Sequence, residues 1–135
     1  MAGSPNTSLI VVLIVDDDPL LRMLAVDVVE EAGFAAIEEG DADEAVALLE
    51  VRSDIALVFT DINMPGTMDG LKLAHAVRDR WPPVKIIVVS GQIRPGQEEL
   101  PPNTRFFEKP YRAAAMVEEL RSLVGSPVTS QPAAV

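Results

Sequence analysis

Residues Leu9–Pro19 read LIVVLIVDDDP, and this stretch decides the fold. Its first seven residues are apolar and mostly β-branched, which is typical of a strand buried on both faces of a parallel sheet. Three aspartates follow at once, and a proline comes after them. An aspartate before a proline favours a helix N-cap with proline at the first helical position. We therefore expect a buried strand, a short acidic turn and a helix capped by Asp18.

The remainder of the chain repeats this alternation of short apolar runs and segments of helical period. The strands are expected at Leu9–Val15, Phe34–Glu38, Ile55–Thr60, Val84–Val89 and Thr104–Phe107. Helices are expected at about 19–32, 41–51 and 69–80, and Met116, Val117, Leu120 and Val124 mark a last helix. Strands that alternate with helices form βαβ units. The sequence therefore predicts an α/β fold with a doubly wound, five-stranded parallel sheet in the order 2-1-3-4-5.

Composition limits the classes of protein to which the chain can belong. Its 135 residues hold 21 Asp plus Glu, 11 Lys plus Arg and no cysteine, for a formal net charge of -10. This charge argues against nucleic acid and anionic membranes as partners, and the lack of cysteine excludes a disulfide framework. The run Leu9–Val15 is too short to span a membrane and lacks the basic residues that precede a signal peptide core. We expect a cytoplasmic protein with one domain at 9–124 and disordered tails at 1–8 and 125–135.

Polar residues gather where the expected strands end. Asp16 and Asp17 follow the first strand, Asp61 the third, Ser90 the fourth and Lys109 the fifth. In the order 2-1-3-4-5 these strand ends meet at one crevice. Clustered carboxylates repel each other, and Mg²⁺ relieves the repulsion while also binding phosphoryl oxygens. A lysine beside them suits a further phosphoryl oxygen, so the sequence predicts a pocket for Mg²⁺ and a phosphoryl group carried by a carboxylate.

Four motifs, LIVDDDP, FTDINMPGTMDG, VVSG and FFEKPY, resemble in order the marks of the response-regulator receiver domain, the CheY-like fold of two-component signalling. The resemblance covers nearly all of 9–124. It implies that Asp61 is the phosphoryl acceptor and that Mg²⁺ binds Asp16, Asp17, Asp61 and the backbone carbonyl of Asn63. It also implies that Ser90 and Lys109 contact the phosphoryl group, and that Phe106 is the aromatic residue that reports phosphorylation.

The resemblance implies a stand-alone regulator rather than an enzyme. A sensor histidine kinase or a histidine phosphotransfer protein would supply the phosphoryl group, because the single histidine, His75, has the place of a structural residue in the middle of a helix. The signal would leave through contacts with a downstream protein, as an effector, a relay shuttle or a phosphate sink. Slow loss of the phosphoryl group to water would be the only turnover.

Three other interpretations compete with this one. A haloacid-dehalogenase-type phosphatase also uses an aspartate nucleophile with Mg²⁺, but Asn63 stands where its second aspartate acts as general acid. A dinucleotide-binding module needs glycines in its first turn, where this chain has aspartates. A degenerate receiver that only binds proteins is disfavoured by the complete set of polar residues.

The sequence departs from the receiver pattern at four places. Gly66 and Thr67 lengthen the loop after Asp61, Gly91 follows Ser90, and Phe106 replaces the frequent tyrosine. The fourth departure is the proline-rich connection 92–103, where at most one helical turn fits, from about Pro95 to Glu99. We expect a shortened fourth helix that is mobile until phosphorylation or a partner orders it, and a protein that is monomeric when unphosphorylated.

Overall fold

The computed structural model describes residues 10–64, 68–91 and 94–125. Its strands are β1 (Val11–Val15), β2 (Ala35–Glu39), β3 (Ile55–Asp61), β4 (Lys85–Ser90) and β5 (Thr104–Glu108). Its helices are α1 (Pro19–Glu31), α2 (Ala42–Val51), α3 (Gly70–Arg80), α4 (Ala113–Val124) and the single 3₁₀ turn η1 (Gln97–Glu99). The strands are all parallel and lie in the order β2-β1-β3-β4-β5. The predicted fold class and strand order are confirmed.

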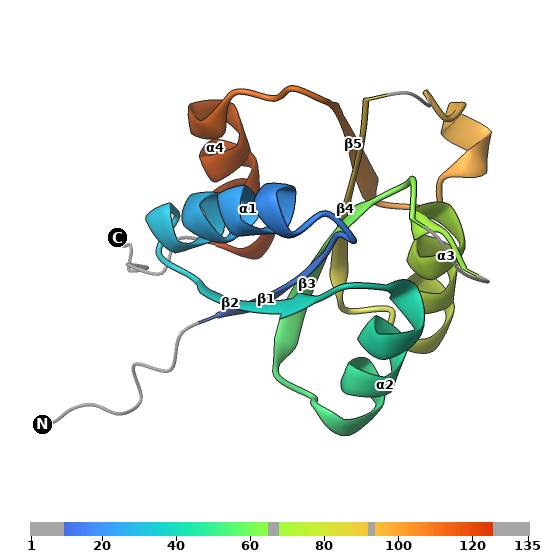
Figure 1. Cartoon of the computed structure of the whole chain (residues 1–135). Helices are drawn as coiled ribbons and strands as arrows, with labels where there is room; N and C mark the ends of the chain where they lie inside the picture. The colour runs from blue at the N-terminus through green and yellow to red at the C-terminus, as the bar shows by residue number, and fades with distance from the viewer. Residues whose placement is uncertain (1–9, 65–67, 92–93, 126–135) are drawn as a thin grey trace, which may run out of the picture.

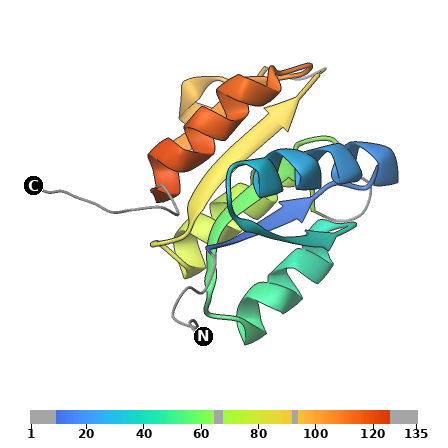
Figure 2. The same ribbon diagram turned by 90° about the vertical axis from the view of Figure 1, so that its left-hand side faces the viewer.

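Helices cover both faces of the sheet, α1 and α4 on one side and α2 and α3 on the other (Figures 1 and 2). Every residue of β1 is buried, as the unbroken apolar run predicts, and neighbouring residues of the strand enter opposite cores. The core beneath α1 and α4 includes Val12, Ile14, Val29, Leu57, Phe59, Ile87, Met116 and Leu120. The core beneath α2 and α3 includes Leu13, Val15, Leu49, Val58, Leu73, Val77, Ile86 and Val88. The two cores fix the sheet between them and hold its carboxyl edge in place.

Aspartates set where three of the helices begin. The Asp18 side chain accepts hydrogen bonds from the backbone N–H groups of Leu20 and Leu21, and Pro19 opens α1, so the predicted cap is confirmed. Asp41 and Asp69 cap α2 and α3 in the same way. Such caps satisfy backbone donors that have no partner within the helix. The start of α1, and with it the turn that carries Asp16 and Asp17, is therefore defined by local chemistry.

The connection between β4 and β5 contains no helix longer than η1 among its described residues, which confirms the single turn that the prolines predict. Side chains of α3 hold it in place. The Nε2 atom of His75 lies 2.7 Å from the carbonyl oxygen of Glu99, and the Nε–H of Arg78 donates to the carbonyl oxygen of Pro102 at 2.9 Å. His75 thus has a structural contact, and the expected mobility of the connection stays a prediction.

Some expectations fall on residues outside the described ranges. The tails 1–8 and 126–135 and the inserted residues Gly66 and Thr67 are among them. No helix within the described ranges is long and apolar enough to cross a membrane.

Candidate functional site

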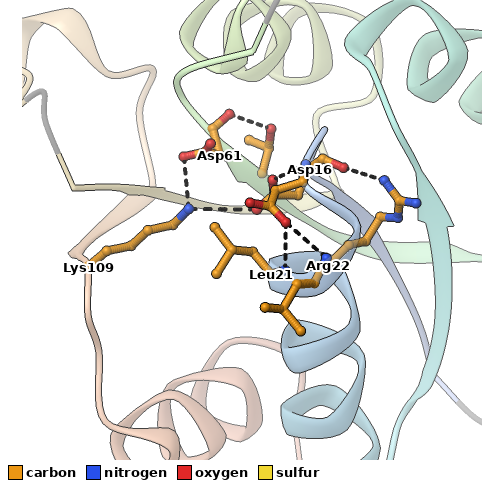
Figure 3. A network of polar contacts seen from close by, with 8 residues as sticks. Asp16, Leu21, Arg22, Asp61 and Lys109 are labelled. Carbon is orange, nitrogen blue, oxygen red and sulfur yellow. Dashed lines mark hydrogen bonds and ion pairs between the residues drawn. The ribbon is translucent and has the colours of Figure 1, made fainter.

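Two aspartates and a lysine meet at the carboxyl edge of the sheet (Figure 3). Asp16 directly follows β1, Asp61 ends β3 and Lys109 directly follows β5. The Nζ atom of Lys109 lies 3.6 Å from Oδ2 of Asp16 and 3.3 Å from Oδ1 of Asp61. The strand order brings these residues together although they are far apart in the sequence. The sequence analysis expected these side chains to meet at the strand ends, and Asp16, Asp61 and Lys109 do so.

Asp17 completes an acidic cluster with these two carboxylates. Carboxylate oxygens of Asp16, Asp17 and Asp61 all lie within 4.8 Å of one another. Asp16 and Asp61 are buried, whereas Asp17 is exposed at the mouth of the cluster. Lys109 pairs with Asp16 and Asp61, and among the described residues no other cation forms an ion pair with the three carboxylates, so the cluster has excess negative charge. Oxygen ligands of this kind fit a hard divalent cation such as Mg²⁺.

Burial determines how the two inner carboxyl groups titrate. It raises the pKa of Asp61 above the ordinary value, while Lys109 lowers this pKa and Asp16 raises it further. Burial likewise raises the pKa of Asp16, against the opposing effects of a hydrogen bond from the Asp18 N–H and of Lys109. In both residues desolvation outweighs the single ammonium group. A bound cation would remove this penalty on the charged form.

Ser90 and Asn63 lie at the same edge, whereas Phe106 is the middle residue of β5. Ser90 ends β4 and is fully buried, and its carbonyl oxygen accepts a hydrogen bond from the N–H of Lys109 at 3.0 Å. Asn63 is half-buried, two residues beyond Asp61. Phe106 lies on β5 and packs in part against the core beneath α2 and α3. The roles assigned to these three residues stay predictions.

Close backbone packing holds Asp61, and the sequence analysis missed the residues responsible. A Cβ atom placed on Gly70 would lie 1.9 Å from the carbonyl oxygen of Asp61. The N–H of Gly70 donates to the carbonyl oxygen of Ile62 at 3.0 Å. The buried hydroxyl of Thr60 donates to the carbonyl oxygen of Asp61 at 2.9 Å. The glycine after Asp69 was visible in the MDG motif, but the contact that requires it exists only in the folded chain.

A hydrophobic surface lies beside the acidic cluster. Leu20, Leu21, Met23 and Leu24 of α1 are exposed, and we call them the α1 patch. Leu21 and Leu24 also line a pocket of about 600 Å³ that reaches Asp16 and Lys109. Exposed apolar side chains gathered on one helix make this face of α1 a candidate contact surface, which the sequence analysis did not identify.

Residues 12–121 match the family model of the response regulator receiver domain. The chain belongs to this family. It is a receiver domain of a two-component response regulator, and such domains act with histidine kinases or phosphotransfer proteins. The resemblance inferred from the four motifs is confirmed.

Two curated relatives are much longer than this chain. It is 32% identical over 116 residues to the nitrogen assimilation regulatory protein NtrX of Azorhizobium caulinodans, a match that covers 78% of this chain and 24% of that protein. It is 32% identical over 134 residues to the response regulator protein FleR of Pseudomonas aeruginosa, covering 90% of this chain and 28% of that protein. The chain thus spans about a quarter of the length of these relatives.

Solved structures show the same fold at the scale of the whole chain. The response regulator receiver protein from Sinorhizobium medicae WSM419 superposes with a TM-score of 0.78 at 24% identity, covering 88% of this chain and 97% of that one. At this identity the likeness shows the fold alone.

The first prediction concerns the contact between Gly70 and Asp61. Gly70→Ala should lower the free energy of unfolding by about 1–3 kcal/mol, because the added methyl group forces the backbone of Asp61 or Gly70 to move. Urea unfolding measures this loss. Gly91→Ala is the matched control, since its Cβ would meet Lys109 Cβ at an ordinary 3.5 Å. Equal losses in the two variants would contradict the proposed steric constraint.

The second prediction concerns pH. Burial raises the pKa of Asp61 in the folded state above its value in the unfolded state. The stabilisation that protonated Asp61 gives the folded state is therefore complete below the unfolded-state pKa. It is lost as the pH rises through the folded-state pKa. Without divalent cations, Asp61→Asn should therefore be more stable than the wild type at neutral pH. The gain should vanish below the ordinary aspartate pKa of about 3.9, where both states of the wild type are protonated.

Urea unfolding at neutral pH and at a pH below the ordinary aspartate pKa measures the difference in unfolding free energy between Asp61→Asn and the wild type. Asp79→Asn, at an exposed position of α3, is the control for a generic effect of the amide. A gain for Asp61→Asn that is the same at both pH values would show that the buried charge is not its cause.

Proposed function

We propose that Asp61 accepts a phosphoryl group from a phosphohistidine on a partner kinase or phosphotransfer protein, with Mg²⁺ at the acidic cluster. The observation that carries this proposal is the place of Asp61, which belongs both to the acidic cluster and to the ion pair with Lys109 at 3.3 Å. One carboxylate is thus next to a cation site and to a fixed ammonium group. This arrangement suits a group that becomes a phosphorylated carboxylate.

The chemistry assigns a task to each residue of the site. A carboxylate oxygen of Asp61 attacks phosphorus, the P–N bond breaks, and its electron pair stays on the imidazole of the donor. Lys109 neutralises charge on a phosphoryl oxygen, and the Ser90 hydroxyl donates a hydrogen bond to another. Water later attacks the acyl phosphate, which releases inorganic phosphate and restores the carboxylate. The chain is then a phosphoryl acceptor and not an enzyme with a separate substrate.

Asp16, Asp17, Asp61 and the backbone carbonyl of Asn63 would hold the Mg²⁺. When bound, the ion supplies the positive charge that a phosphoryl group needs beside three carboxylates. Asp17 is exposed at the mouth of the cluster, so we assign it as a direct ligand and Asp16 as one that acts partly through water.

The α1 patch supports a protein as the phosphoryl donor. A small phosphodonor needs only the polar pocket, whereas apolar side chains exposed beside that pocket lose contact with water when a protein covers them. Leu24 is 51% exposed on the same helix whose start carries the Asp18 cap. A donor bound there would lie next to Asp16 and Lys109, which line the adjoining pocket.

Signal output would pass through β5 and the connection before it. Movement of the Ser90 hydroxyl toward the phosphoryl group would make room for Phe106, whose ring carries no polar atom that burial would leave unpaired. A downstream protein would then recognise the altered surface. We also propose that the unphosphorylated chain is monomeric.

The third prediction tests phosphorylation directly. Incubation with acetyl phosphate and Mg²⁺ should add one phosphoryl group to the wild type, detected by intact-protein mass spectrometry, and Asp61→Asn should abolish it. Asp18→Asn is the matched control, because asparagine keeps the helix cap and Asp18 is outside the acidic cluster. This control should still be phosphorylated.

Two results would oppose the proposal. An unchanged mass shift in Asp61→Asn would place the phosphoryl group on another residue. Rapid, repeated turnover of p-nitrophenyl phosphate by the wild type would favour the phosphatase alternative.

The fourth prediction separates a protein donor from a small one. Leu24→Ser should be phosphorylated by acetyl phosphate at the wild-type rate. The rate of transfer from the cognate kinase should fall by about 10- to 100-fold, since losing one large apolar contact costs roughly 1.5–3 kcal/mol. The donor is the one that labels the wild type fastest among the purified histidine kinases of the source organism.

The control for this experiment is Val51→Ser. Val51 is 79% exposed on α2, on the opposite face of the sheet from α1 (Figure 1). Val51→Ser should accept phosphoryl groups from acetyl phosphate and from the cognate kinase at the wild-type rates. Equal effects of the two substitutions would contradict docking at the α1 patch.

A further inference from the structure

The turn that carries Asp16 and Asp17 is held from outside the acidic cluster by Arg22. The Nη1–H of Arg22 donates to the carbonyl oxygen of Asp16 at 2.6 Å. Its Nε–H donates to Oε1 of Glu38 on β2 at 3.1 Å. Figure 3 shows the guanidinium group on the far side of Asp16 from Lys109. The arginine therefore bridges α1, β2 and the end of β1.

The main chain and the side chain of Asp16 are held by different partners. Its N–H donates to the carbonyl oxygen of Glu39 at 3.2 Å, and its carbonyl oxygen is bound by Arg22. Its Oδ1 accepts the N–H of Asp18 at 3.0 Å, which leaves Oδ2 facing Lys109. With the peptide groups on both sides of Asp16 fixed, the carboxylate has a defined direction toward Asp61.

Only arginine can make this bridge. Its planar guanidinium group carries several N–H donors in a rigid arrangement, whereas the ammonium group of lysine is a compact point charge on a flexible chain. Arg22 meets two acceptors on different elements at once. A lysine would keep the positive charge but lose the fixed geometry.

We propose that Arg22 is a positioning residue for the cation site: by fixing the main chain of Asp16 it keeps the carboxylates of Asp16 and Asp17 in the cluster with Asp61. The inference rests on the proposed function, because it assigns the acidic cluster to Mg²⁺. Arg22 touches neither the cation nor the phosphoryl group in this role.

The sign of the effect separates positioning from simple electrostatics. Arg22 is a cation close to the acidic cluster, so its charge opposes the binding of a second cation. If charge were its whole contribution, neutral substitutions would tighten divalent cation binding. Positioning predicts the reverse, since loss of a residue that orients metal ligands weakens metal binding.

The test measures Mn²⁺ binding by electron paramagnetic resonance, with Mn²⁺ as the probe for Mg²⁺. Arg22→Gln should raise the Mn²⁺ dissociation constant by about tenfold. Arg22→Lys should also raise it, although the charge is kept. In acetyl phosphate labelling, Arg22→Gln should raise the half-saturating Mg²⁺ concentration more than it lowers the rate at saturating Mg²⁺.

Arg121→Gln is the matched control. Arg121 donates from Nε to the carbonyl oxygen of Ala32 at 3.1 Å, which is the same kind of contact at the other end of α1. It should bind Mn²⁺ like the wild type. If Arg22→Gln fails to fold, Arg22→Lys carries the test.

Tighter or unchanged Mn²⁺ binding in the folded Arg22 variants would overturn the inference, as would equal weakening in Arg121→Gln. The proposed function fails by a separate result, namely a wild type that acetyl phosphate does not label at Asp61. The Mn²⁺ measurement on the Arg22 variants does not depend on that labelling.

Discussion

The candidate site depends on the burial of two carboxylates beside one ammonium group. Asp16 and Asp61 are buried at the sheet edge. The Nζ atom of Lys109 lies 3.6 Å from Oδ2 of Asp16 and 3.3 Å from Oδ1 of Asp61. Desolvation raises the pKa of both carboxyl groups despite this lysine. The fold thus holds a site that is short of positive charge, and a hard divalent cation is the kind of group that would relieve this shortage.

Such a site persists only because the backbone around it is held firmly. Gly70 allows α3 to approach the carbonyl oxygen of Asp61 closely, and the Thr60 hydroxyl binds the same oxygen. On the other strand, Arg22 binds the carbonyl oxygen of Asp16 and the Asp18 N–H binds its carboxylate. The repulsion among the carboxylates is therefore resisted by contacts to main-chain atoms, which sidechain movement alone cannot release.

The surroundings of the site divide into two regions with different properties. The α1 patch and the adjoining pocket form an apolar surface beside Asp16 and Lys109. At the other side of the sheet edge, His75 and Arg78 bind the connection before β5 to α3. The first region is apolar, and the second links the segment before β5 to α3 through side-chain hydrogen bonds.

The sequence by itself determined the elements, their order and the groups at the strand ends. Apolar runs such as Val11–Val15 must be buried on both faces, and local caps such as Asp18 define helix starts, so pattern and neighbouring residues suffice for these features. The pairing of Asp16 and Asp61 with Lys109 followed once the strand order was inferred. Gly70, Arg22 and the α1 patch were decided only by the tertiary structure. Each depends on contacts or exposure set by residues distant in the chain, such as Arg22 with Glu38, and neither hydrophobic period nor motif spacing encodes which atoms finally meet.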